Sequence, residues 1–118
     1  MPGKKKGGGQ WGITWSEVAD AIADHQLHYS CKLEFVVQRT SYGKNGRGEH
    51  WLVSCRAIAG RDGAYRHEGY AECSVGGVSG ASSFPGAFVR TTIDASLDLD
   101  RRRRDQAYDR DNSVPART

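Results

Sequence analysis

The chain has 118 residues, which is enough for one domain with a modest core and too few for a large multi-step enzyme. Its formal net charge of +3 is carried by the two ends, because residues 10–100 contain eight Lys or Arg against eleven Asp or Glu. No stretch approaches the roughly 18 apolar residues of a membrane helix, and no apolar signal segment follows the lysines near the N-terminus. We therefore expect a soluble intracellular protein, cytoplasmic or nuclear, without a membrane partner.

Residues 1–10 are mostly glycine and lysine and lack apolar periodicity, so we expect a disordered basic arm. A helix is predicted to begin at Thr14 or Ser16, since either hydroxyl can cap a first turn that contains Glu17. The apolar stripe of this helix consists of Trp15, Val18, Ala19 and Ile22. The stripe fades near residues 25–26, where we expect the helix to end.

Between residues 29 and 75, three segments alternate apolar and polar residues, as half-buried strands do. Their apolar positions, segment by segment, are Tyr29, Cys31, Leu33, Phe35 and Val37; then Trp51, Val53, Cys55, Ala57 and Ala59; then Tyr65, Gly69, Ala71, Cys73 and Val75. The pair Asp62-Gly63 favours a tight hairpin turn between the second and third segments, because both residues tolerate positive φ. The pattern predicts an antiparallel meander with one apolar face, which the helices before and after it can cover.

The three cysteines occur one per predicted strand, each on the apolar register. The simplest interpretation is that Cys31, Cys55 and Cys73 are small buried hydrophobic residues. The alternative is a zinc site that starts from the spacing of His25, His28 and Cys31. Its further ligands would come from Cys55, Cys73, His50 or His67. We favour the first interpretation and expect no metal and no cofactor.

The link between the first two strands, residues 41–48, combines three glycines, two cations and one aromatic residue. Glycine lets a backbone approach phosphates, cations neutralise them, and an aromatic ring can stack on a base. An ordinary exposed hairpin tip has a similar composition, so this alternative stays open. Because cations cluster here within an otherwise acidic core, we interpret the tip and neighbouring strand positions as a nucleic-acid-binding side of the meander. Its candidate residues are Arg39, Tyr42, Lys44, Arg47, Arg56, Arg61 and Arg66.

Residues 76–86 are rich in glycine and serine and lack the Gly-Lys-Ser/Thr ending of a P-loop, which indicates a flexible connector. A second helix is predicted from about Pro85. The stripe expected to cover the meander is Val89, Ile93 and Leu97, flanked by Phe88, Thr92, Ala95 and Leu99. Arginines at positions 101–104 favour the helix dipole and can bind phosphate, so Arg101 and Arg102 join the candidate site. Residues 105–118 are predicted to be a disordered tail, which leaves residues 11–104 as the single domain.

The predicted order of helix, three strands and helix is an α+β fold that occurs in two families of nucleic-acid-binding domains. The double-stranded-RNA-binding domain has a lysine pair at the start of its second helix, whereas residues 83–88 of this chain contain no lysine. Residues 62–70 and 92–97 resemble the second turn, the third strand and the long helix of single-strand annealing proteins of the Rad-fifty-two type. The resemblance implies a ring or filament of subunits that holds one strand in a basic groove with its bases exposed, without a cofactor.

This chain departs from that family at one basic pair of the long helix, where it has Leu97 and Asp98, while Arg101 falls on a basic position of the family. We expect a non-enzymatic protein that binds single-stranded DNA, or RNA, and anneals complementary strands in recombination or replication as a ring-like homo-oligomer. Two alternatives stay open: an RNA binder like the double-stranded-RNA-binding domain, and a small viral or structural nucleoprotein. Catalysis would need a cluster such as Asp94, Asp98 and Asp100, and aspartates opposite an apolar stripe are usually solvated.

Overall fold

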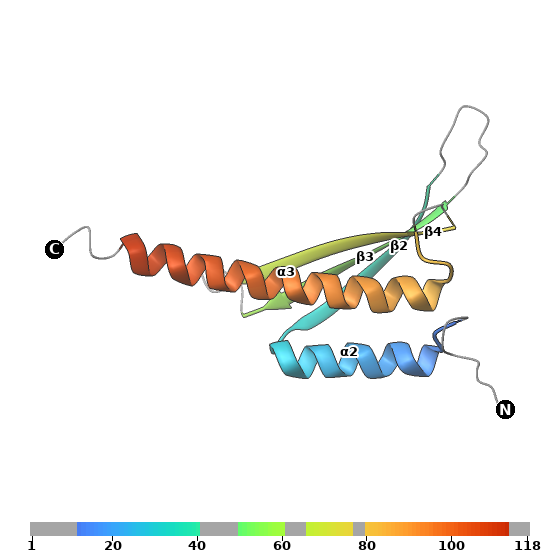
Figure 1. Ribbon diagram of the computed structural model, residues 1–118, viewed down its shortest axis with the longest axis horizontal. Coiled ribbons are helices and arrows are strands. Elements are labelled where there is room, and N and C mark those ends of the chain that lie inside the picture. The colour runs from blue at the N-terminus through green and yellow to red at the C-terminus, as the bar shows by residue number, and fades with distance from the viewer. Residues whose placement is uncertain (1–11, 41–49, 61–65, 77–79, 114–118) are drawn as a thin grey trace.

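The computed structural model describes residues 12–40, 50–60, 66–76 and 80–113. Its elements follow in the order α2 (Trp15–Tyr29), β2 (Lys32–Thr40), β3 (His50–Ala59), β4 (His67–Val75) and α3 (Phe84–Ser113) (Figure 1). The predicted α+β fold, with a helix, an antiparallel three-stranded sheet and a second helix, is therefore confirmed. Residues 1–10 and 114–118, the hairpin tip and the Asp62-Gly63 turn lie outside the described residues. Within the described part of the chain, neither helix is long and apolar enough to cross a membrane.

The sheet has the strand order β2-β3-β4, and both neighbouring pairs are antiparallel. Across its middle, Phe35 lies opposite Cys55, and Cys55 lies opposite Ala71. These positions belong to the register that the alternation predicts as apolar. The inward placement of Cys55 and Cys73 is confirmed because both are buried, while Cys31 is half-buried just before β2.

Helix α2 begins where the sequence predicts and ends later. Its N-cap is Thr14, whose hydroxyl accepts a hydrogen bond from the Glu17 N–H at 3.1 Å, while the Glu17 carboxylate accepts one from the Thr14 N–H at 2.7 Å. This reciprocal pair satisfies N–H groups that have no partner inside the helix. The helix continues past residues 25–26 until Ser30 adopts a left-handed conformation with φ 52°. Tyr29, which we expected to start the first strand, is therefore the last residue of the helix.

Both helices lie on one face of the sheet, side by side and running in the same direction (Figure 1). α3 packs on β3 and β4, whereas α2 packs on α3 and touches the sheet at β2. The predicted stripe of α2 is therefore only partly covered. Val18 is buried, but Trp15 is 58% exposed and contacts Phe88 of α3 edge to face, with ring centroids 5.4 Å apart. No described helix or strand covers the opposite face of the sheet.

The face of α3 that covers the sheet differs from the predicted one. We expected Ile93 and Leu97 to face the meander, but they are 38% and 51% exposed. The buried positions of α3 are mostly small: Ala87, Thr91, Thr92, Ala95, Ser96 and Leu99. The reason is a close approach at Gly69, where a Cβ would meet the backbone of Ala95 and Leu99, with Leu99 Cα at 2.7 Å. Because the helix backbone lies almost directly on β4, large apolar side chains fit only on the outer surface of α3.

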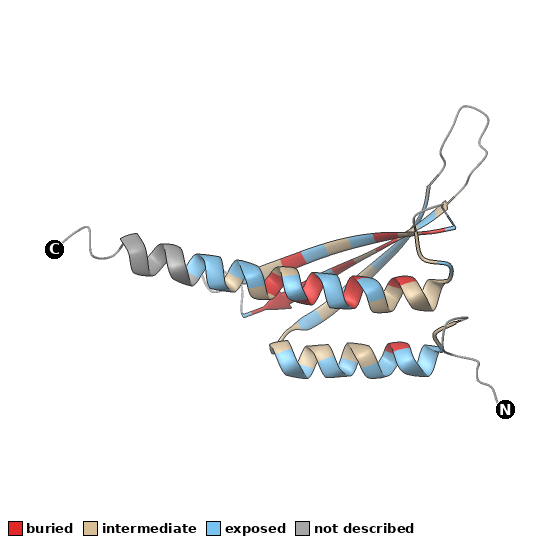
Figure 2. Cartoon of the chain, in the orientation of Figure 1, coloured by how far each residue is buried: buried red, intermediate tan, exposed pale blue. Residues whose placement is uncertain are grey.

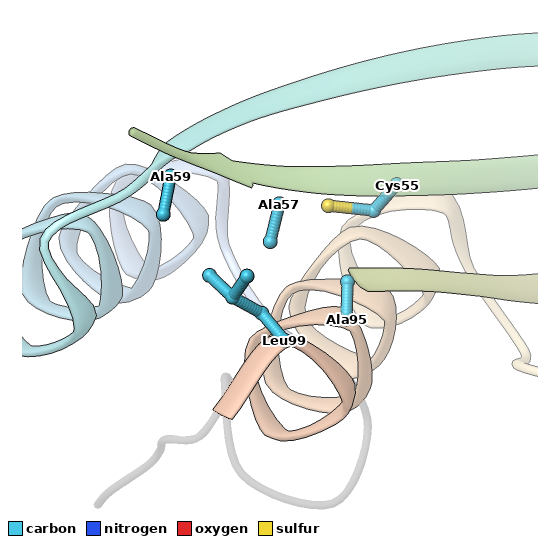
Figure 3. Close-up of a cluster of buried hydrophobic side chains, with 5 residues drawn as sticks. All are labelled: Cys55, Ala57, Ala59, Ala95 and Leu99. Atoms are coloured by element: carbon cyan, nitrogen blue, oxygen red, sulfur yellow. The ribbon is translucent and has the colours of Figure 1, made fainter. Parts of the chain in front are cut away.

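The core is correspondingly narrow. Buried residues gather along β3, β4 and the facing side of α3 (Figure 2). In its main cluster, Ala95 and Leu99 of α3 lie against three small residues of β3, namely Cys55, Ala57 and Ala59 (Figure 3). Leu99 is the largest fully buried side chain among the described residues, so a single leucine provides much of the packing between helix and sheet.

The boundaries of α3 agree with the prediction at its start and differ at its end. The helix starts at Phe84, next to the predicted Pro85, and the Gly86 N–H donates to the Ser83 hydroxyl at 3.2 Å. We expected it to stop at residue 104 and a disordered tail to follow, but it continues to Ser113. Ion pairs at helical spacing, such as Arg101 with Asp105 at 3.3 Å, favour these turns after the apolar stripe has ended. The folded unit therefore extends beyond the predicted boundary at 104.

Candidate nucleic-acid interface

The predicted site residues do not form one basic surface. Four of them lie outside the described residues: Tyr42, Lys44, Arg47 and Arg61. Arg39 lies on the inner register of β2, opposite Trp51 and near the link to β3. Arg56 lies on the open face of the sheet, between Glu34 and Tyr70 in the register. Our expectation that the strand arginines lie on one side of the meander is therefore wrong for Arg39 and Arg56, because their positions alternate to opposite faces.

Arg56 and Arg66 are held by carboxylates on the open face. Arg56 lies 3.8 Å from Glu34 and 3.6 Å from Glu68, and Arg66 Nε donates to Glu68 Oε2 at 2.6 Å. The hydrogen bond from Arg66, together with the charge of Arg56, keeps the pKa of Glu68 below its ordinary value. All four side chains are a third to a half exposed, so these ion pairs contribute little to stability. A phosphate, which accepts charge-assisted hydrogen bonds well, can compete for both arginines.

Arg101 and Arg102 share Asp98 as a partner. Arg101 Nη2 donates to Asp98 Oδ1 at 2.6 Å, and Arg102 Nε donates to Oδ2 at 2.9 Å. The backbone N–H of Tyr70, at the edge of β4, donates to the same Oδ2 at 2.9 Å. Burial alone would raise the pKa of Asp98, but the Tyr70 N–H and the two guanidinium groups outweigh it and hold the pKa below its ordinary value. Asp98 thus ties α3 to β4 and orients both arginines.

Arg66, Arg101 and Arg102 converge on one groove between the start of β4 and the C-terminal half of α3. The groove has a volume of about 390 Å³. Its lining residues are Arg66, His67, Glu68, Arg101, Arg102, Asp105 and Gln106. The link that carries Arg61 joins β3 to β4 at this same end of the sheet, since Ala59 pairs with His67. The groove can accept phosphate groups, because each guanidinium offers a planar set of donors that matches phosphate oxygens.

The other two arginines of the run on α3 have different partners. Arg103 donates to the carbonyl oxygens of Tyr29 and Ser30 at 2.7 and 3.3 Å. It therefore caps the C-terminus of α2, where the helix dipole is negative. Arg104 pairs with Asp100 at 3.3 Å. The four consecutive arginines thus lie on different sides of α3, and Arg101 and Arg102 are the two that line the groove.

The described residues contain no group of three His, Cys, Asp or Glu side chains that could hold a metal ion. The alternative zinc motif is accordingly not assembled by its described members, and His25 Nδ1 lies 2.8 Å from the Ala21 carbonyl oxygen. Burial raises the pKa of Cys55 to about 12 and also raises that of Cys31. Both cysteines are therefore protonated thiols at neutral pH, which is the less reactive form.

Two structural partners of the groove escape the sequence reasoning. Asp98 stands three and four residues before Arg101 and Arg102, which is the spacing of ion pairs on one helix face, so this part of its role is readable in the sequence. Its bond to Tyr70 and the bond of Arg103 to Tyr29 join residues 28 and 74 positions apart, and no local pattern indicates them. No family model, curated protein or solved structure matches this chain, so the ligand of the groove is inferred from its own chemistry.

Proposed function

We propose that the protein binds single-stranded DNA, or RNA, and anneals complementary strands as a homo-oligomer without an enzymatic step. The observation that carries this proposal is the convergence of Arg66, Arg101 and Arg102 on one groove. Three guanidinium groups from two elements can contact the phosphates of one strand, and such contacts position a backbone without reading its sequence. A strand held by its phosphates keeps its bases free to pair with a complement, which is what annealing requires.

The distribution of charge supports two separate contributions to binding. The described residues carry ten Lys or Arg against twelve Asp or Glu, whereas the segments outside them carry seven against two. Long-range attraction to a polyanion therefore comes mainly from those segments, which contain Lys4, Lys5, Lys6, Lys44, Arg47, Arg61 and Arg117. The groove contributes oriented contacts at short range.

The order of elements, with both helices on one face of the sheet, also fits a double-stranded-RNA binder. The start of α3 argues against this candidate, because Phe84, Pro85 and Gly86 occupy the positive end of the helix dipole, where that family places lysines against phosphates. The three cysteines are free thiols, as is usual in a reducing compartment, which supports a cytoplasmic or nuclear protein.

Binding and annealing assays with matched charge variants test the proposal. Fluorescence anisotropy compares single-stranded DNA, single-stranded RNA and duplex RNA of equal length, and labelled complementary strands report the annealing rate. The groove variant replaces Arg66, Arg101 and Arg102 with alanine. The control variant removes three cations away from the groove, namely Lys32, Arg90 and Arg104.

We expect a preference for single strands and an affinity that falls steeply with salt. Each lost phosphate contact lowers the slope of log affinity against log salt by about 0.7 for a single strand, so the groove variant should lose about two units of slope. Its annealing rate should drop about tenfold or more, while the control stays close to wild type. A preference of the wild type for duplex RNA favours the other candidate, and unchanged annealing by a folded groove variant contradicts the proposed site.

A further inference from the structure

The two edges of the sheet are finished differently. At the free edge of β4, the Tyr70 N–H is bonded to Asp98 of α3, and the Ser74 carbonyl oxygen accepts from the Ala81 N–H at 2.8 Å. Both groups would otherwise be available to a strand from another molecule. The chain thus closes its own β4 edge, with α3 at one point and with residues 80–81 at another.

The free edge of β2 is closed only where it starts. There the Leu33 N–H donates to the Gln26 side chain of α2 at 3.2 Å. Because edge-facing groups recur at every second residue of an antiparallel strand, the N–H groups of Phe35 and Val37 point to the same side as that of Leu33. No described residue accepts a hydrogen bond from either of them. The middle of β2 therefore presents unpaired ladder groups.

The side chains of this edge also lack the usual protection. β2 pairs continuously with β3 over Lys32–Thr40, so it has no bulge, and it contains no proline. Val36 and Val37, on opposite faces of the strand, are 49% and 43% exposed. Proteins commonly protect an edge of this length with charges, prolines or bulges. An unprotected apolar edge beside a closed one indicates a surface that another strand covers.

We propose that β2 pairs antiparallel with β2 of a second copy of this chain, which joins two three-stranded sheets into one of six strands. Because the β4 edge is closed, an edge-to-edge contact between two copies has to join β2 to β2. This contact uses the same patch on both subunits and closes after two copies. β4 and the groove lie at the opposite side of the sheet, so both grooves of the dimer stay accessible.

The register follows from the part of the edge that is open. Gln26 occupies the Leu33 N–H, which leaves residues 34–40 with Val37 at their midpoint. Pairing about that midpoint sets Val37 opposite Val37, Val36 opposite Gln38, Phe35 opposite Arg39, and Glu34 opposite Thr40. No like charges face each other in this register, and like charges directly opposite would destabilise the pair.

This proposal concerns assembly alone and holds whether or not the protein binds nucleic acid. The ring expected from the family resemblance would need an additional head-to-tail contact, because a two-fold contact alone does not propagate. Mass measurements without nucleic acid therefore separate the two ideas, and annealing assays are not needed to judge this one.

Sedimentation of the full chain, without nucleic acid, should give the mass of a dimer. Val37→Pro removes an N–H that the monomer does not use, and edge strands tolerate proline, so this variant should fold as a monomer. Val36→Lys places a charge at the centre of the contact and should weaken self-association at least tenfold. The control Leu27→Lys, at a position of α2 that is 84% exposed, should leave the dimer intact.

Crosslinking tests the register. Directly opposite, hydrogen-bonded residues of antiparallel strands have Cα atoms about 5.5 Å apart, which is within disulfide range. In a Cys31→Ser background, Val37→Cys should therefore form a covalent dimer under mild oxidation, and Ser54→Cys in the middle of the sheet should not. A monomeric wild type overturns the proposal, as does an assembly of any size that Val36→Lys and Val37→Pro leave unchanged. Should the proline variant not fold, the lysine variant and the crosslink decide.

Discussion

The contact between β4 and α3 predicts that one added methyl group at Gly69 strongly destabilises the fold. The Cβ of an alanine would meet backbone atoms of Ala95 and Leu99, with Leu99 Cα at 2.7 Å, well inside ordinary van der Waals distance. No side chain can rotate away from these atoms, so α3 has to move off the sheet. Overpacking a core costs about 1–3 kcal/mol, and we expect the upper end, about 3 kcal/mol, because the shift also disturbs the Tyr70 to Asp98 bond and the packing of Leu99.

Urea and thermal unfolding followed by circular dichroism measure this loss. A loss of about 3 kcal/mol should lower the melting temperature of a chain of this size by roughly 10–15 °C. The control is Gly12→Ala, whose added Cβ meets nothing within 4 Å and should change stability by less than about 0.5 kcal/mol. If the variant at position 69 unfolds together with this control, helix and strand are not in backbone contact. Our explanation for the small residues on the buried face of α3 would then be refuted.

Three further predictions concern single side chains. Because folding lowers the pKa of Asp98 below its ordinary value of 3.8, the unfolded state binds more protons in that range, so the stabilisation is present above the ordinary value and is lost as the pH falls through the lower folded value. Asp98→Asn should cost about 1–2 kcal/mol at neutral pH and flatten this part of the acid dependence of urea unfolding; an unchanged acid profile would contradict the role of Asp98. Arg103→Ala should cost about 1 kcal/mol by uncapping α2, whereas Arg104→Ala should barely move the urea midpoint, so equal effects would argue against the cap. Cys55→Ala should cost about 1–2 kcal/mol, and Cys55, with its pKa raised to about 12 by burial, should react with a maleimide only after unfolding; rapid modification of the folded protein would show that the thiol is accessible.

The elements that the sequence predicts correctly are those whose signals lie within a few residues. Thr14 and Glu17 are three residues apart and form the expected cap. The period-two alternation of β2 and β3 places Phe35 and Cys55 on the covered face. Element ends are predicted less well, because the end of α2 depends on one residue, Ser30, in a left-handed conformation that serine rarely adopts.

The candidate site is predicted residue by residue but not as an arrangement. Arg66, Arg101 and Arg102 were each candidates from local charge, and their convergence depends on how α3 crosses β4. The error over Arg39 and Arg56 had a signal in the sequence: the alternation puts Arg39 in phase with Val37 on the inner face and Arg56 out of phase with Cys55. Charge clustering was given more weight than strand phase, and the phase was correct.

The sequence by itself determined the order of the elements, the two faces of the sheet and the start of α2, because each depends on local periodicity or capping. Only the tertiary structure decided which face of α3 is buried and which partner each arginine has. Hydrophobicity alone favours Val89, Ile93 and Leu97 as the buried stripe, but Gly69 lets the backbones of β4 and α3 approach so closely that small residues such as Ala95 have to face the sheet. Distances between backbones far apart in the chain set this choice, and no local pattern encodes them.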